Sequence, residues 1–257
     1  MPTWQGILLS QSPFLSEVEA EPETDEYTEE ISESIVAKEE NTMPVLEVEA
    51  EPEDETISEV ELDPNIKTVT ISPSSPEGYD YAEGVYIKND TDEEVDVAEL
   101  LSQSPDIELS SEPVVLIVHT HASEAYYPEG EDIYEPTDTD RTEDTNYNVV
   151  RVGDRLEEVL NGHGIGTVHI REIFDYPSYS GSYTRTLTAI EEALDKYPSI
   201  SVIIDLHRDA MISADGSSYR TITEIDGENA AQLMLVVGTD KGGLEHPDWK
   251  SNLVLAT

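Results

Sequence analysis

Three histidines and one glutamate in this sequence have the types and the spacing that could hold a metal ion. His119 and His121 lie two residues apart in VVLIVHTHASE, and Glu124 ends that segment. Residues two apart on an extended chain point to the same side, so we expect both imidazoles on one face. His207 ends a second apolar segment, ISVIIDLH. Two imidazoles and one carboxylate form the ligand set of many catalytic zinc sites.

This ligand set predicts a specific chemistry. It leaves a fourth position on Zn²⁺ for water, which then ionises near neutral pH and can attack an amide carbonyl that the metal polarises. The chain has no cysteine, so a zinc site must use histidine and carboxylate ligands. The candidate ligands are His119 or His121 together with Glu124 and His207, and the spacing leaves open which of the two histidines binds. The alternative is that these side chains hold a substrate, or nothing.

Three further polar residues lie beside His207. Asp205 is on the same face of the strand and could orient a metal-bound imidazole, or act only as a hydrogen-bonded structural carboxylate. Arg208 and Asp209 follow directly, and an arginine can bind a substrate carboxylate or phosphate in two-pronged fashion. We therefore predict a substrate-binding role for Arg208 and Asp209, with an internal ion pair as the alternative.

The remaining histidines and one acidic loop carry weaker signals. We expect His163 and His169 to be structural, and His246 to be structural or exposed, because a single histidine is more often a satisfied polar group than a ligand. The loop TDTDRTEDTN lacks the glycine and the terminal glutamate of a calcium loop. We interpret it as a solvated loop whose Glu143 could lie at the start of the next helix.

Apolar runs and helical periodicity indicate the elements that would position these residues. Continuous apolar segments at 114–119, 165–170 and 200–207 are typical of strands covered on both faces. Amphipathic helices are predicted between them, over 146–161 and 182–198. This order predicts an α/β fold with an open, mostly parallel sheet and helices on both faces, in which ligands bind at the carboxyl ends of the strands.

The predicted helices each have one apolar face. In the first helix that face comprises Val149, Val152, Leu156, Val159 and Leu160, and in the second it comprises Leu187, Ile190, Ala193 and Leu194. Farther on, SSYRTITEI predicts an edge strand or hairpin arm, AQLMLVVGT an apolar strand, and HPDWKSNLVLAT the beginning of a helix. Because the chain stops in that helix, we expect the domain to be truncated at its carboxyl end.

Charge and composition divide the chain into three regions. The net charge of −45 argues against nucleic acid or anionic lipid as a partner, since both need a basic surface. Residues 1–63 are rich in Glu, Pro, Ser and Thr and contain EVEAEPE twice, which predicts a disordered acidic spacer. Residues 64–112 predict a small β-containing lead-in, and residues 113–257 form the α/β domain.

Four blocks of this sequence resemble the stage II sporulation protein P family. They are VLIVHTHASEAYYP, NYNVVRVGDRLEEVLNGHGI, FDYPSYSGSYTRT and VIIDLHRDA, and they occur in that order. The resemblance implies a zinc-dependent N-acetylmuramoyl-L-alanine amidase that acts on peptidoglycan during engulfment and also cleaves peptide cross-links. It implies stage II sporulation proteins D and M as partners, and an extracytoplasmic location at the septal or forespore-engulfing membrane.

By this resemblance, His119 or His121, Glu124 and His207 inherit the metal role. Amidases of this kind place a general-base glutamate on a strand near the carboxyl end of the domain, and we expect it beyond Thr257. The first residues, MPTWQGILLSQSPFL, lack the basic region and long apolar run of a membrane anchor, so we expect the family's anchor to be absent from this chain. The competing hypothesis is a non-catalytic peptidoglycan-binding or scaffold module of the same fold.

Overall fold

The structure is a computed structural model of the whole chain. It describes residues 5–9, 66–73, 75–127, 134, 137, 140–212, 217–241, 246 and 249–257. Most of the spacer predicted for residues 1–63 therefore lies outside the described residues. The exception is strand β1, Gln5–Leu9, which the composition of that region did not predict.

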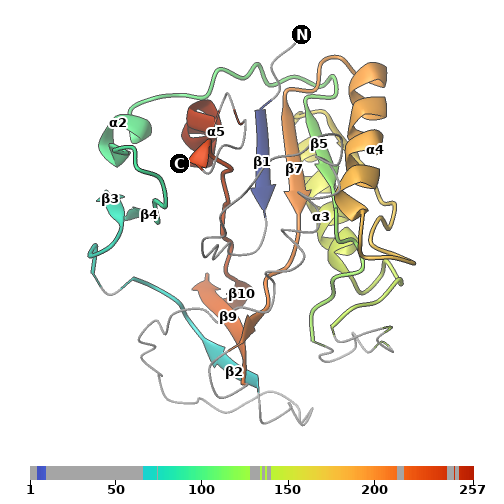
Figure 1. Cartoon of the computed structure of the whole chain (residues 1–257), viewed down its shortest axis with the longest axis horizontal. Helices are drawn as coiled ribbons and strands as arrows, with labels where there is room; N and C mark the ends of the chain where they lie inside the picture. Colours follow the sequence, from blue (N-terminus) through green and yellow to red (C-terminus); the bar gives the residue numbers. More distant parts are fainter. Residues whose placement is uncertain are drawn as a thin grey trace, which may run out of the picture.

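A four-stranded parallel sheet forms the centre of the molecule. Its order is β1-β7-β5-β6, where β5 is Val115–Val118, β6 is Thr167–His169 and β7 is Val202–Leu206. Every pairing in this sheet is parallel, and β5 is fully buried. Figure 1 shows β1, β7 and β5 running side by side. The predicted α/β fold with parallel strands is confirmed.

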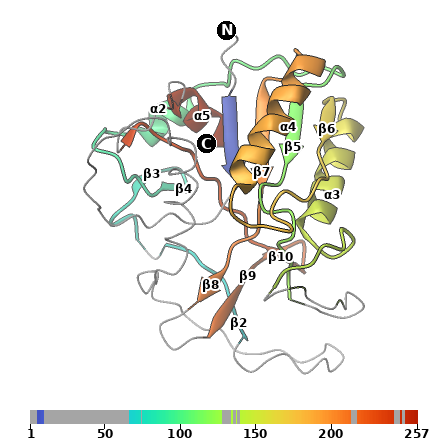
Figure 2. The ribbon, with the colours of Figure 1, turned by 45° about the vertical axis from the view of Figure 1, so that its right-hand side comes forward.

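Helices cover both faces of this sheet. Helix α4, Ser182–Lys196, packs on the face that carries Leu116 and Val118. Helices α3, Val149–Gly162, and α5, Trp249–Ala256, contribute to the core on the opposite face. Figure 2 shows α4 in front of the sheet. No helix in the described part of the chain combines the length and the hydropathy needed to cross a bilayer.

Helix α3 begins after Asn148, whose side chain bonds to a backbone N–H that has no partner within the helix. Asn148 has an extended backbone, and its side-chain oxygen accepts a hydrogen bond of 3.0 Å from the Val150 backbone N–H. Its side-chain nitrogen donates to the Thr142 carbonyl at 3.0 Å, which ties the preceding loop to the helix start. The helix therefore starts at Val149 rather than at residue 146, and Glu143 lies before it.

The inward face of each long helix is narrower than the periodicity predicted. Val152, Val159 and Leu187 are 39%, 38% and 45% exposed, so their assignment to the buried faces is wrong. The buried side of α3 instead consists of Val149, Val150 and Gly153, with the partly buried Leu156 and Leu160. Gly153 belongs to it because a methyl group there would lie 2.6 Å from the His119 and His169 rings. The periodic pattern of large apolar residues did not predict that a glycine would lie on the inward face of α3.

A second four-stranded sheet lies beyond the carboxyl ends of the parallel strands (Figure 1). It contains β8, Met211–Ile212, and the hairpin of β9, Ser218–Ile225, with β10, Glu228–Ala231. Asp226 and Gly227 form the turn, and both have the positive φ that a tight two-residue hairpin requires. The segment SSYRTITEI is thus a hairpin arm. Strand β2, Ile66–Val69, pairs with it in parallel.

The rest of the lead-in forms a hairpin and a short helix. Strands β3, Asp80–Ala82, and β4, Val85–Ile87, pair antiparallel. Helix α2, Val97–Leu101, starts at Asp96, whose carboxylate accepts a hydrogen bond from the Glu99 N–H. Residues 64–112 therefore contain the β structure that their patterns predicted, together with one short helix.

The segment AQLMLVVGT does not form the apolar strand that its composition predicted. After Ala231 the chain leaves β10, and Leu233 is 83% exposed. Gln232 explains part of this, because its side chain exchanges two hydrogen bonds of 2.8 Å with the Ile71 backbone. The Gln232 side chain therefore makes the hydrogen bonds to Ile71 that the backbone of a neighbouring strand would otherwise make. The prediction of a strand for this segment was wrong.

Candidate metal centre

The structure brings His121, Glu124 and His207 together after the ends of β5 and β7. Val118 is paired with Asp205 in these adjacent parallel strands, so both chains leave the sheet at the same edge. Glu124 Oε1 lies 3.6 Å from His121 Nδ1, and Glu124 Oε2 lies 3.3 Å from His207 Nδ1. One ligand atom from each residue falls within 4.8 Å of the other two.

The burial of these atoms is consistent with a metal ligand set. All three side chains are almost completely inaccessible, yet His121 Nε2, Glu124 Oε1 and both ring nitrogens of His207 have no hydrogen-bond partner. Leaving a buried polar atom unsatisfied costs about 1–3 kcal/mol. A divalent cation bound by these atoms would remove that cost, so the residues fit the zinc that the sequence predicted.

Asp205 holds the His207 ring from the side opposite Glu124. Asp205 Oδ1 lies 3.0 Å from His207 Nε2, and the carboxylate accepts hydrogen bonds from the Thr120 N–H at 2.8 Å and the Thr120 hydroxyl at 2.6 Å. This leaves Nδ1 of His207 facing Glu124. A carboxylate on the far nitrogen is the usual way in which a protein orients a metal-bound imidazole.

The carboxylates also control the protonation of His207. Burial alone would lower its pKa, but the negative charges of Asp205 and Glu124, 3.0 and 3.3 Å from its two ring nitrogens, outweigh burial and raise the pKa to about 10. Burial would raise the pKa of Glu124, but contacts with His121 and His207 lower it below its ordinary value. Without metal, the centre is therefore a buried cation held between carboxylates.

His119 points away from this cluster. Its Nδ1 donates to the Leu206 carbonyl at 2.7 Å, and its Nε2 lies 2.8 Å from Nε2 of His169. The expectation that both histidines face the same side is wrong, because the chain turns after Val118 instead of continuing as a strand. Of the two candidates, the structure brings His121 to the other predicted ligands.

A second group of potential ligands lies around His169. Asp154, Glu157 and His169 also lie within metal-binding distance of one another. However, Arg171 Nε donates to Asp154 at 2.6 Å, and Arg171 Nη2 donates to Glu157 at 2.5 Å. One arginine already pairs with both carboxylates, so we interpret this group as a structural ion-pair network.

Arg208 and Asp209 differ in their relation to the cluster. The Arg208 backbone N–H donates to Glu124 Oε2 at 3.0 Å, and its guanidinium donates to the Asp140 carbonyl at 3.1 Å. Asp209 is exposed and accepts a hydrogen bond of 2.7 Å from the Ala210 N–H. Arg208 therefore borders the cluster, whereas the carboxylate of Asp209 is bound to its neighbour's backbone.

Sequence reasoning missed the residues that surround His121 and Glu124. Arg141 lies 3.7 Å from Glu124, although its loop was predicted to be solvated, and Thr142 next to it is buried. Tyr179 stacks on His121 with ring centroids 4.4 Å apart. Neither Arg141 nor Tyr179 directly follows a predicted strand or belongs to a periodic pattern. The only sequence signal for these surroundings was the FDYPSYSGSYTRT block of the family resemblance, which contains Tyr179.

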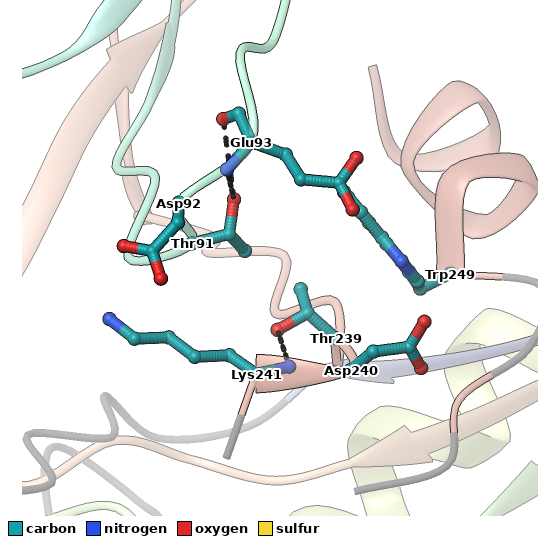
Figure 3. A pocket seen from close by; sticks show the side chains of 7 residues that line it. All are labelled: Thr91, Asp92, Glu93, Thr239, Asp240, Lys241 and Trp249. Atoms are coloured by element: carbon teal, nitrogen blue, oxygen red, sulfur yellow. Dashed lines mark hydrogen bonds between the residues drawn. The ribbon is translucent and has the colours of Figure 1, made fainter. Parts of the chain in front are cut away.

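A cavity of 160 Å³ lies apart from these residues (Figure 3). Carboxylates of Asp92, Glu93 and Asp240 line it together with Lys241 and Trp249. Lys241 donates to the Asp90 carbonyl, and Lys250 pairs with Glu93. None of the predicted site residues reaches this cavity, which joins the lead-in to the carboxyl-terminal part of the chain.

Comparison with known proteins gives a consistent family. The chain matches the family described as Stage II sporulation protein P (SpoIIP) over residues 5–257. It is 33% identical over 140 residues to "Stage II sporulation protein P" of Bacillus subtilis (strain 168), which covers 51% of this chain and 32% of that protein. The match therefore spans about a third of the relative's length. No solved structure matches the chain.

Proposed function

Because this chain belongs to the stage II sporulation protein P family, a sporulation family, we propose that it carries the zinc centre of a peptidoglycan hydrolase. The proposed reaction is cleavage of the amide bond between N-acetylmuramic acid and the stem peptide. The observation that carries the proposal is the convergence of His121, Glu124 and His207, with buried atoms that lack hydrogen-bond partners.

In this proposal His121, Glu124 and His207 bind the ion, and neighbouring residues fix the orientation of these ligands. Glu124 receives the Arg208 backbone N–H on Oε2, which restrains its carboxylate. Asp205 keeps a proton on Nε2 of His207, so that Nδ1 remains available. When bound, zinc lowers the pKa of its water and polarises the substrate carbonyl. A buried, preorganised ligand set suits this chemistry because it needs no rearrangement.

The raised pKa of His207 gives the proposal a proton balance. With a pKa of about 10, the metal-free His207 carries a proton at neutral pH, and that proton must leave Nδ1 before a metal can bind. Metal binding should therefore release about one proton from this residue. Calorimetry in buffers of different ionisation enthalpy measures that release.

The family resemblance also suggests where the protein acts. We propose an extracytoplasmic location at the membrane that engulfs the forespore, with stage II sporulation proteins D and M as partners. The strongly acidic chain, at −45, would be repelled by anionic polymers in the wall, so recognition of peptidoglycan would depend on the local site rather than on overall charge.

Metal analysis of the purified protein tests the proposal. We expect one zinc per chain, lost in His207→Ala and retained in His163→Ala, a matched variant of an exposed histidine at the end of α3. A metal-free protein that still binds muropeptides would support the non-catalytic alternative. For an active protein, mass spectrometry of digested peptidoglycan distinguishes a released stem peptide from a cut cross-link.

A further inference from the structure

Arg141 is fixed opposite Glu124 by the backbone. The two residues form an antiparallel bridge, and the neighbouring backbone bonds are Thr142 N–H to the Ser123 carbonyl at 2.8 Å and Ala125 N–H to the Asp140 carbonyl at 2.9 Å. The Arg141 side chain therefore starts from a position that the turn after β5 determines. Any movement of the segment that carries Arg141 would displace the segment that carries Glu124.

A buried carboxylate anchors the Arg141 guanidinium. Nη1 donates to Asp175 Oδ2 at 2.8 Å and to the Ser123 hydroxyl at 3.2 Å. The Asp175 side chain is completely buried and also accepts hydrogen bonds from the Ser123 N–H at 3.1 Å and the Ser123 hydroxyl at 2.5 Å. Because a buried carboxylate needs its cation, this pair is costly to separate.

The other end of the guanidinium faces the proposed metal ligand. Arg141 Nη2 lies 3.7 Å from Glu124 Oε1, an oxygen that has no hydrogen-bond partner. This distance is too long for a hydrogen bond, but opposite charges at this separation still attract. Asp175 offsets the arginine's charge, so Arg141 can restrain Glu124 without adding a net positive charge that would repel a metal cation.

Tyr179 connects Arg141 to the proposed histidine ligand. The Arg141 guanidinium lies over the Tyr179 ring at 5.1 Å, and the same ring stacks on His121 with an interplanar angle of 17°. Tyr183 contacts His121 edge-on at 5.4 Å. Aromatic and cation–π contacts of this kind favour one relative orientation of the rings.

We propose that Arg141 is a positioning residue for the metal centre: anchored by Asp175, it restrains the Glu124 carboxylate directly and the His121 ring through Tyr179. The inference rests on the proposed function, because it assigns a role toward the same ion. Arg141 contacts neither the ion nor the substrate in this role. It acts on His121 and Glu124, the two of the three proposed ligands that come from the turn after β5.

The test measures zinc affinity with a competing chelator dye in three variants. Arg141→Met removes the guanidinium and keeps the length of the side chain, and we expect zinc to bind about 10–100-fold more weakly. Arg141→Lys keeps the charge but cannot contact Asp175 and Glu124 with one planar group, so we expect an intermediate loss. Arg155→Met is the matched control, since Arg155 is 70% exposed on α3 and pairs with the equally exposed Glu158.

Cobalt substitution gives a readout of geometry that a general loss of stability would not change. We expect the visible spectrum of the Co²⁺ protein to change in Arg141→Met and Arg141→Lys, and to be unchanged in Arg155→Met. Thermal unfolding with a chelator present identifies variants that do not fold. Should Arg141→Met fail to fold, the affinity and spectrum of Arg141→Lys decide.

The outcomes separate the inference from the proposed function. Wild-type protein that binds zinc through His207, together with Arg141 variants of unchanged affinity and spectrum, overturns the positioning role alone. Wild-type protein whose zinc binding is absent, or survives His207→Ala, overturns the metal centre and the positioning role with it. Weaker binding and an altered cobalt spectrum in both Arg141 variants support the inference.

Discussion

The segment after β5 contributes one histidine to each of two clusters, His121 to the metal centre and His119 to a pair with His169. The pKa values of His207 and of His119 shift in opposite directions. At the metal centre, His207 lies between two buried carboxylates that raise its pKa to about 10. Two residues before His121, His119 pairs with His169, and burial lowers the pKa of both to about 4. Residue type is the same in both clusters. At His207 two buried carboxylates outweigh the effect of burial, whereas at His169 burial and the charge of Arg171 outweigh the half-exposed carboxylate of Asp154.

The comparison also separates a binding site from a structural contact. The atoms around His121 lack partners, whereas His119 bonds with both ring nitrogens, to Leu206 and to His169. The remaining ring nitrogen of the pair, His169 Nδ1, lies 3.1 Å from Asp154 Oδ1. Both rings lie against Gly153, where α3 packs on the sheet.

The largest predicted effect distinguishes the two carboxylate groups. Glu124→Gln should weaken zinc binding by more than about 100-fold, beyond the loss typical of residues around a ligand, because it removes a charged ligand. Glu157→Gln, in the group neutralised by Arg171, should leave the affinity unchanged. Titration with a chelator dye measures both. Zinc lost from the Glu157 variant instead would move the metal to the second group.

The two clusters should give stability opposite dependences on pH in a chelator. His169 has a folded pKa of about 4, below its unfolded value of 6.5, so its contribution is present above pH 6.5 and is lost as the pH falls toward 4. His207 has a raised folded pKa, so its contribution is present below pH 6.5 and is lost as the pH rises toward 10.

Urea unfolding of two variants, measured as a function of pH, checks both dependences. We call the loss of stability at falling pH the acid limb and the loss at rising pH the alkaline limb. His169→Gln should flatten the acid limb relative to the wild type by about 1–3 kcal/mol, and His207→Gln should flatten the alkaline limb by a similar amount. The wild-type acid limb should keep a contribution from His119. If His169→Gln altered the alkaline limb instead, the assignment of neutral and charged imidazoles to the two clusters would be incorrect.

A single methyl group should disrupt the structural cluster without touching the metal centre. Gly153→Ala places a Cβ 2.6 Å from the His119 and His169 rings, which are buried and cannot move away. We expect a loss of about 1–3 kcal/mol in the free energy of unfolding, despite the better helix propensity of alanine. Gly162→Ala, with open space around it in the same helix, should be neutral or stabilising by up to about 1 kcal/mol.

The smallest predicted effect concerns the ring stacked on His121. Tyr179→Leu should weaken zinc binding by a few-fold, in line with the roughly 0.5–1.5 kcal/mol of an aromatic contact. Tyr179→Phe keeps the stacked ring and should bind zinc like the wild type. Equal affinities in both variants would show that the orientation of His121 does not depend on this contact.

Much of the fold could be predicted because its signals are local. The buried runs that became β5 and β7, and the periodic segments that became α3 and α4, each contain enough apolar residues to specify their structure. Side-chain contacts were beyond this reasoning. The inward position of Gly153 and the exposure of Val152 depend on which residues lie across the interface, which a periodic pattern does not encode.

The candidate site divides in the same way. His121, Glu124, Asp205 and His207 could be proposed because chemistry-bearing residues at the ends of parallel strands meet at one edge of a sheet. Arg141 and Tyr179 could not, because they reach the site from loops whose paths depend on contacts such as the bridge between Glu124 and Arg141. The segment AQLMLVVGT was mispredicted for the same reason, since its composition favoured a strand that lacks a sheet partner.

The sequence by itself determined the parallel sheet and the edge at which the histidines gather, because hydrophobic periodicity and strand direction are properties of the chain. The choice between His119 and His121 was decided only by the tertiary structure. The chain turns after Val118, and this turn sends one imidazole toward His169 and the other toward Glu124 and His207. Two residues of equal type and adjacent position differ in role because a turn depends on the contacts that surround it.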